Sequence, residues 1–303
     1  MLPTGEQIAI AHGDQRAVIT EVGATLRAYV KAGVPVIEGF AAEEMAEHGR
    51  GQIGFPWPGR MGDGEWSFSD RSAHAAIDDP SHATSSHGFV RWRRFEVTSV
   101  NQNRCSLVLV VHPTPDYPFL TELKMDYHLG PTGLTVTSTV TNLDEVPVPF
   151  GLGFLPYAAV STPTIEGAQL KVPAKAYVAV NDRHLPTGEI LPVMGNAYDF
   201  REAKSVNGHD LDVTFTELIR DDTGMCTLSL ADSKGGEVEV SMDRNFPYAQ
   251  VCTGDALPVG RRRTSVVLAP LTCPPDALRS GKDIVILEPG QHWAASWRLR
   301  RVG

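Results

Sequence analysis

The chain has 303 residues, of which 42% are hydrophobic and 21% charged, and its formal net charge is −9. This composition is typical of a globular protein with a large buried core, and the acidic balance argues against nucleic acid or an anionic membrane as a partner. No run of about 18 apolar residues predicts a membrane helix, and the first residues do not resemble a secretion signal. We therefore expect a cytoplasmic protein without a membrane partner.

Short segments of alternating apolar and polar residues dominate the chain and predict strands. Such strands are expected at residues 105–111, 134–141, 236–242, 250–253, 265–268 and 284–287. Helices are expected only at residues 41–47 and, for about one turn, at residues 216–220. Many strands bounded by glycine, proline and asparagine turns, with no repeat or linker, predict an all-β protein. We expect one large antiparallel β-sandwich domain that spans residues 1–303.

Several stretches place polar side chains beside rigid or permissive backbone. In the segment PWPGR two prolines constrain a turn that presents Arg60, whose planar guanidinium can donate to several oxygen atoms. Gly88 follows His87 and allows the backbone to approach a ligand closely. The segments at residues 149–160 and 181–193 have similar glycine- and proline-rich turns. Each stretch alone also fits a structural role, as an ion-paired arginine or a turn histidine.

The segment SVVLAPLTCPPDAL, residues 265–278, combines a strand with a stiff corner. Pro274 and Pro275 fix two φ angles and provide no N–H donors. A rigid corner after a buried strand is well suited to hold a catalytic group. However, the residue at the end of the strand is Ala269, which has no acid–base chemistry.

Taken together, these stretches resemble the aldose 1-epimerase (galactose mutarotase) family, in its bacterial branch. The resemblance is carried, in order, by RGQ…PWPGR, SHGFVRW, PFGLGFLPY, DRHLPTGE, LDVTF, QVCTGD, TCPPDALRSG and LEPGQHWAASW. It implies a large antiparallel β-supersandwich with a sugar cleft on a concave face, and neither a metal nor an organic cofactor. In this family a carboxylate takes the proton of the C1 hydroxyl of a sugar while an acid protonates the ring oxygen, so that the anomers interconvert.

The resemblance implies ligand-binding roles for some residues and the loss of the usual catalytic side chain at two other positions. Arg60 matches the arginine that contacts the ring oxygen and the C1 region, and His87 matches the first histidine, which orients the sugar. Asp212 matches the aspartate that accepts hydrogen bonds from sugar hydroxyls. Leu155 stands where the family usually has the histidine that acts as the general acid. Ala269 stands where the family usually has the glutamate that acts as the general base.

Loss of one member of an acid–base pair typically lowers the rate by about 10²–10⁴, so ordinary mutarotation is not expected. The first hypothesis is an isomerase or cyclase of altered chemistry that acts on a hemiacetal-like, glycosidic or less polar ligand. Its catalytic candidates are His87 and Arg60, with Tyr157 and Asp212 as further ligand-binding residues. A non-catalytic sugar-binding protein and a slow aldose mutarotase that uses His87 are the alternatives. The expected partner is a small molecule, bound by a monomer or a homodimer.

Overall fold

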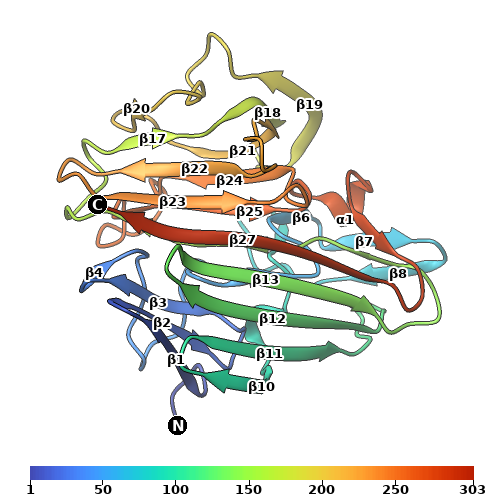
Figure 1. Cartoon of the computed structure of the whole chain (residues 1–303). Coiled ribbons are helices and arrows are strands. Elements are labelled where there is room, and N and C mark those ends of the chain that lie inside the picture. Colours follow the sequence, from blue (N-terminus) through green and yellow to red (C-terminus); the bar gives the residue numbers. More distant parts are fainter.

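The computed structural model describes residues 1–303, and two large antiparallel sheets dominate it (Figure 1). The first sheet runs in the order β10 (Glu96–Asn101), β11 (Arg104–Val111), β12 (Thr121–Gly130), β13 (Gly133–Asn142), β27 (His292–Val302), β23 (Glu237–Met242), β22 (Cys226–Ala231), β17 (Gln169–Lys171) and β20 (Lys204–Ser205). The C-terminal strand β27 pairs with β13 on one side and with β23 on the other, as Figure 1 shows. The last strand therefore joins the two halves of this nine-stranded sheet.

The second sheet has eight strands and carries the candidate site. Its order is β19 (Pro186–Pro192), β18 (Ala174–Val180), β21 (Asp212–Leu218), β24 (Tyr248–Cys252), β25 (Ser265–Leu271), β15 (Gly153–Phe154) and β5 (Ile53–Gly54), with β16 (Tyr157–Ala159) paired to β25. The rings of Phe154, from this sheet, and Trp297, from the first, lie 5.2 Å apart between their centroids. The two sheets therefore pack against each other.

Smaller elements surround the two sheets. A four-stranded sheet near the N-terminus contains β1 (Gln7–His12), β2 (Gln15–Thr20), β3 (Leu26–Lys31) and β4 (Val34–Pro35). Three two-stranded sheets pair β6 (Arg60–Gly62) with β9 (Thr84–Ser86), β7 (Glu65–Phe68) with β8 (Arg71–His74), and β14 (Val148–Phe150) with β26 (Val285–Leu287). The helical segments are a 3-10 turn, η1 (Val90–Trp92), and a single short helix, α1 (Ala277–Ser280).

Alternation along the strands separates the core from the candidate site. On β21 and β24, Val213, Phe215, Ala249 and Val251 belong to a core cluster of 62 buried residues. Their neighbours in the sequence have side chains on the opposite face of the sheet, because successive residues of a strand point to opposite sides. That second face is free to form a binding surface.

The structure confirms the all-β antiparallel fold, and each of the predicted strands is present. Both helix predictions are wrong. Residues 41–47 form only turns and irregular backbone. Residues 216–218 belong to β21, which pairs with β18 and β24, so pairing within a sheet overrides the weak local helical signal.

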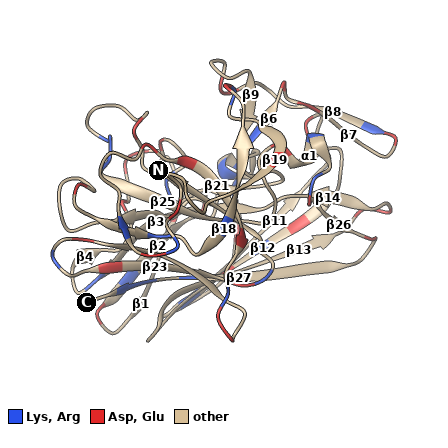
Figure 2. Ribbon diagram, turned by 90° about the horizontal axis from the view of Figure 1, so that it is seen from above, with Lys and Arg blue, Asp and Glu red and all other residues tan.

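Acidic and basic residues are interspersed over the loops and strand ends (Figure 2). Many of the arginines are ion-paired: Arg263 contacts Asp255 at 3.1 Å, and the buried Arg301 contacts Asp232 at 3.1 Å. Both of these arginines are therefore paired with a carboxylate. None of the helical segments has the length and apolar character required to cross a bilayer.

Candidate functional site

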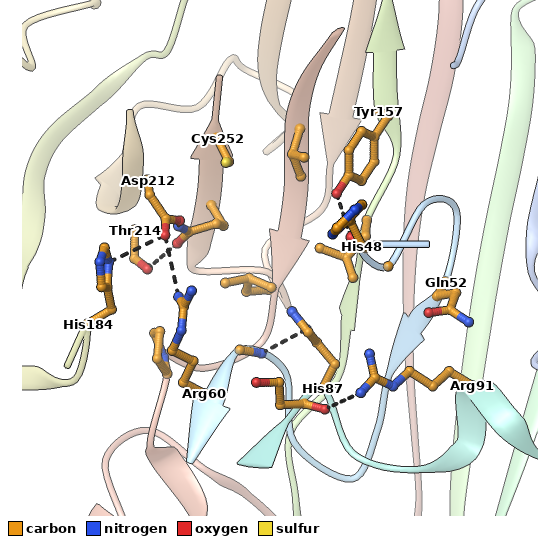
Figure 3. Close-up of a pocket in the computed structure, with 18 of the residues that line it drawn as sticks. His48, Gln52, Arg60, His87, Arg91, Tyr157, His184, Asp212, Thr214 and Cys252 are labelled. Carbon is orange, nitrogen blue, oxygen red and sulfur yellow. Dashed lines mark hydrogen bonds and ion pairs between the residues drawn. The ribbon is translucent and has the colours of Figure 1, made fainter. Parts of the chain in front are cut away.

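A pocket of about 400 Å³ lies on the face of the eight-stranded sheet that does not pack into the core (Figure 3). This size is in the range typical of small-molecule sites. Period-two spacing selects the side chains that line it: Asp212 and Thr214 from β21, and Gln250 and Cys252 from β24. Loops before β5 and around β6 and β9 supply most of the remaining lining.

Asp212 is the centre of a polar network on one wall of the pocket (Figure 3). Its Oδ1 accepts a hydrogen bond of 2.6 Å from Nε2 of Gln250. Its Oδ2 lies 3.4 Å from Nη1 of Arg60 and 3.4 Å from Nδ1 of His184. Thr214 in turn donates to the carbonyl oxygen of the Gln250 side chain. The carboxylate is therefore held in one orientation by groups from separate strands and loops.

Arg60 is held between two carboxylates. Its Nε lies 3.4 Å from Oδ2 of Asp79, opposite the contact with Asp212. Burial by itself raises the pKa of Asp79, but hydrogen bonds from Ser81, His82 and Arg60 outweigh it and lower that pKa to about 2. Asp79 can therefore be charged near neutral pH, and the guanidinium of Arg60 enters the pocket already paired with two carboxylate groups.

The proline-rich corner after β25 positions Arg60. Asp276, at the end of this corner, donates its backbone N–H to the carbonyl oxygen of Arg60 at 2.7 Å, and its Oδ1 accepts from the N–H of Gly62 at 2.8 Å. Gly59 has a φ of +67°, and a Cβ atom there would lie 3.2 Å from Pro275. The corner therefore holds the strand that carries the arginine and packs tightly on the turn before it.

His87 is a neutral hydrogen-bond donor in this pocket. The N–H of Gly59 donates to its Nδ1 at 3.1 Å, so the ring proton must be on Nε2. Burial lowers the pKa of His87 to about 3, with smaller contributions from the charges of Arg91 and Arg60. The imidazole can therefore donate from Nε2 to a ligand oxygen at neutral pH.

The floor of the pocket is hydrocarbon. Leu155 lines the pocket, while Ala269 is fully buried on β25 between two lining residues, Val267 and Leu271. These side chains belong to a separate apolar cluster of seven residues that also includes Tyr157. Positions 155 and 269 themselves therefore supply no proton donor or acceptor.

Tyr157 lines the pocket beside this floor, but its hydroxyl is already used. It donates to the backbone carbonyl of His48, as Figure 3 shows. Burial raises the pKa of Tyr157 above its ordinary value of 10. Its ring contributes apolar surface, and its hydroxyl remains protonated at neutral pH.

A model of the aldose 1-epimerase family matches residues 6–300. The chain belongs to the aldose 1-epimerase family. A bacterial relative, the uncharacterized protein YihR of Escherichia coli strain K12, is 27% identical over 289 residues, which are 95% of this chain and 91% of that protein.

Solved structures agree with this assignment at the level of the fold. A GalM/aldose epimerase homologue from C. elegans superposes with a TM-score of 0.87 at 19% identity, over 98% of each chain. A putative aldose 1-epimerase from E. coli K12 gives a TM-score of 0.82 at 18% identity, over 98% of this chain and 99% of that one. The two-sheet architecture is thus common to these aldose 1-epimerase homologues.

The structure brings Arg60, His87, Tyr157 and Asp212 to one pocket. Residues that were not assigned to the site from the sequence share the pocket with them: His48, Gln52, Trp92, His184, Gln250 and Cys252. His184 was within reach of sequence reasoning, because it lies in DRHLPTGE, one of the segments typical of aldose 1-epimerases. No cluster of three or more His, Cys, Asp or Glu side chains has the arrangement of a metal site.

Proposed function

We propose that the protein is an isomerase that acts on a sugar-like cyclic hemiacetal with one less polar face, by chemistry that does not use positions 155 and 269. The observation that carries this proposal is the division of a single pocket. One wall presents Arg60, His87 and Asp212, while the floor is the apolar cluster around Leu155 and Ala269. A ligand ring with hydroxyl groups on one edge and hydrocarbon on the other is complementary to the polar wall and to the apolar floor.

Unsatisfied hydrogen-bonding capacity supports a hydroxylated ligand. Gln52 lines the pocket with only 2% of its surface exposed, and its Oε1 has no hydrogen-bond partner. A buried acceptor without a partner is costly, and a ligand hydroxyl would satisfy it. Nε2 of His87 can donate, and Asp212 can accept, so the pocket offers both kinds of partner that a hydroxyl requires.

A non-catalytic sugar-binding protein is the second candidate, and the state of His87 favours it. A neutral imidazole that accepts from Gly59 would have to release its last ring proton to act as an acid. This geometry also disfavours a slow mutarotase in which His87 is the sole proton carrier. Binding would then be the whole function, with Arg60, His87 and Asp212 retained for affinity.

Two measurements on the same sugars separate these functions. Calorimetry measures binding of D-galactose, D-glucose and a 6-deoxyhexose, and polarimetry from a pure anomer measures the mutarotation of each. We expect binding with acceleration, strongest for the 6-deoxyhexose, whose methyl group suits the apolar floor. Binding without acceleration would establish the second candidate. Acceleration that persists unchanged in both Arg60→Ala and His87→Ala would remove these residues from the mechanism.

A further inference from the structure

His184 lies on the polar wall of the pocket in a constrained backbone. It belongs to the turn between β18 and β19, with a φ of +55° that only a few per cent of non-glycine residues adopt. Its N–H donates to the carbonyl of Asn181 at 2.9 Å, and the Asn181 side chain accepts from the N–H of Leu185 at 3.2 Å. Left-handed backbone at non-glycine residues is concentrated at functional sites. The turn therefore holds this imidazole in the pocket at some cost in strain.

The contact with Asp212 distinguishes the two ring nitrogens of His184. Nδ1 of His184 faces Oδ2 of Asp212 (Figure 3), at a distance of 3.4 Å. The side chain of His184 is 38% exposed. A carboxylate beside Nδ1 favours the proton on that nitrogen, which leaves the lone pair of Nε2 available. His87 has the opposite arrangement, because its Nδ1 accepts from Gly59 and its Nε2 holds the proton. The pocket thus contains one imidazole prepared to accept a proton and one prepared to donate a hydrogen bond.

We propose that His184, oriented by Asp212, is the general base of this protein. The proposal rests on the isomerase function proposed above. Nε2 of His184 takes the proton of the C1 hydroxyl, the electrons of that O–H bond form the C1 carbonyl, and the bond from C1 to the ring oxygen breaks. The ring oxygen receives its proton back from the His184 imidazolium, so the open-chain aldehyde forms with no net gain or loss of protons. Closure on the other face of the carbonyl reverses these steps.

Arg60 and His87 complete this scheme as electrostatic groups. The ring oxygen becomes negative while the C1–O bond breaks, and donors aimed at developing charge lower the barrier. The guanidinium of Arg60 shares Asp212 with His184, so both side chains lie at the same part of the wall. Because His87 only donates a hydrogen bond, it never has to lose its remaining proton.

Kinetics of His184→Gln test the base directly, with His74→Gln as the matched control. His74 is an imidazole beside a carboxylate, 3.9 Å from Glu65, but it is exposed and lies outside the pocket. We expect His184→Gln to lower kcat for mutarotation of the sugars named above by at least about 100-fold, with dissociation constants by calorimetry changed only a few-fold. His74→Gln should match the wild type.

The outcomes distinguish this inference from the function on which it rests. Wild-type acceleration that His184→Gln leaves intact would overturn the base assignment while the isomerase function stands. Absence of acceleration by the wild type for all three sugars would overturn both.

A second measurement needs no substrate. Imidazole ¹⁵N chemical shifts report which ring nitrogen carries the proton in the neutral side chain. We expect the proton of His184 on Nδ1 and that of His87 on Nε2 in the same sample. A neutral His184 with its proton on Nε2 would contradict the proposal even if the protein proves to be an isomerase, because that nitrogen could not accept.

Discussion

At the scale of single residues, two hydrocarbon side chains, Leu155 and Ala269, belong to the apolar floor of this pocket. Ala269 faces the pocket side of β25 directly opposite Gln250 in the strand register. Leu155 packs against Gly49, where a Cβ atom would lie 2.8 Å from the leucine side chain. A carboxylate at position 269 would enter an apolar cluster. The floor is therefore packed around its present residues. We expect a single replacement to lower stability and a paired replacement to raise the rate of mutarotation.

Replacing both positions should restore the usual acid–base pair. We expect Ala269→Glu alone to destabilise the protein by about 2 kcal/mol or more, because a carboxylate is buried in an apolar cluster. Leu155→His with Ala269→Glu should accelerate galactose mutarotation at least about 100-fold over either single variant. Urea denaturation and polarimetry measure the two effects. A double variant that folds and binds galactose but is no faster than its parents would contradict this account of the floor.

The lowered pKa of His87 predicts a pH dependence of stability. The folded protein binds this proton only near pH 3, whereas the unfolded chain binds it near pH 6.5. Between these values the unfolded state holds more protons, so the free energy of unfolding falls as the pH falls, by at most about 1.4 kcal/mol per unit for one proton. Denaturant titrations between pH 4 and 7 should show a shallower slope for His87→Gln, whose side-chain oxygen still accepts from Gly59. Equal slopes in the two proteins would refute the neutral buried imidazole.

At the scale of elements, the corner from Leu271 to Asp276 links β25 to the strand that bears Arg60. The sequence predicts its stiffness from Pro274 and Pro275, but not what it holds. Three contacts explain its role: the Asp276 N–H to the Arg60 carbonyl, the Gly62 N–H to the Asp276 carboxylate, and Pro275 against Gly59. The corner therefore supports the strand that carries Arg60.

Substitution of Asp276 should weaken both folding and binding. Asp276→Ala leaves the N–H of Gly62 without its acceptor in a buried place, which should cost about 1–3 kcal/mol. It also places alanine at a φ of +62°. Asp276→Asn keeps an acceptor oxygen and tolerates this backbone, so it serves as the matched control. Equal affinity of the two variants for a bound sugar in calorimetry would show that the corner does not position Arg60.

At the scale of the whole molecule, the eight-stranded sheet separates stability from binding. One face contributes to the core of 62 residues, and the other lines the pocket. Adjacent residues on the same strand therefore serve different purposes. Val251 is fully buried in the core, while its neighbour Gln250 supports Asp212.

This division predicts that a substitution on the core face lowers stability and that a substitution on the pocket face weakens ligand binding. Val251→Ala should lower the free energy of unfolding by about 1–3 kcal/mol through lost burial and an unfilled cavity, with little change in ligand affinity. Gln250→Ala should change stability by less than about 1 kcal/mol but weaken sugar binding, because Asp212 loses a 2.6 Å hydrogen bond. Denaturation and calorimetry on both variants provide the comparison. Weaker sugar binding in Val251→Ala together with a larger loss of stability in Gln250→Ala would contradict the separation of core and pocket on the two faces of the sheet.

The sequence by itself determined the all-β class, because alternation of apolar and polar residues is a local property of each strand. It also determined that positions 155 and 269 are hydrocarbon, because residue identity needs no coordinates. Only the tertiary structure decided which groups face each imidazole: Asp212, at the start of β21, meets His184 in the turn between β18 and β19, and Gly59 meets His87 across another turn. Such pairs are distant along the chain, and strand periodicity contains no information about which loops converge. The direction in which each imidazole can move a proton therefore depends on folding.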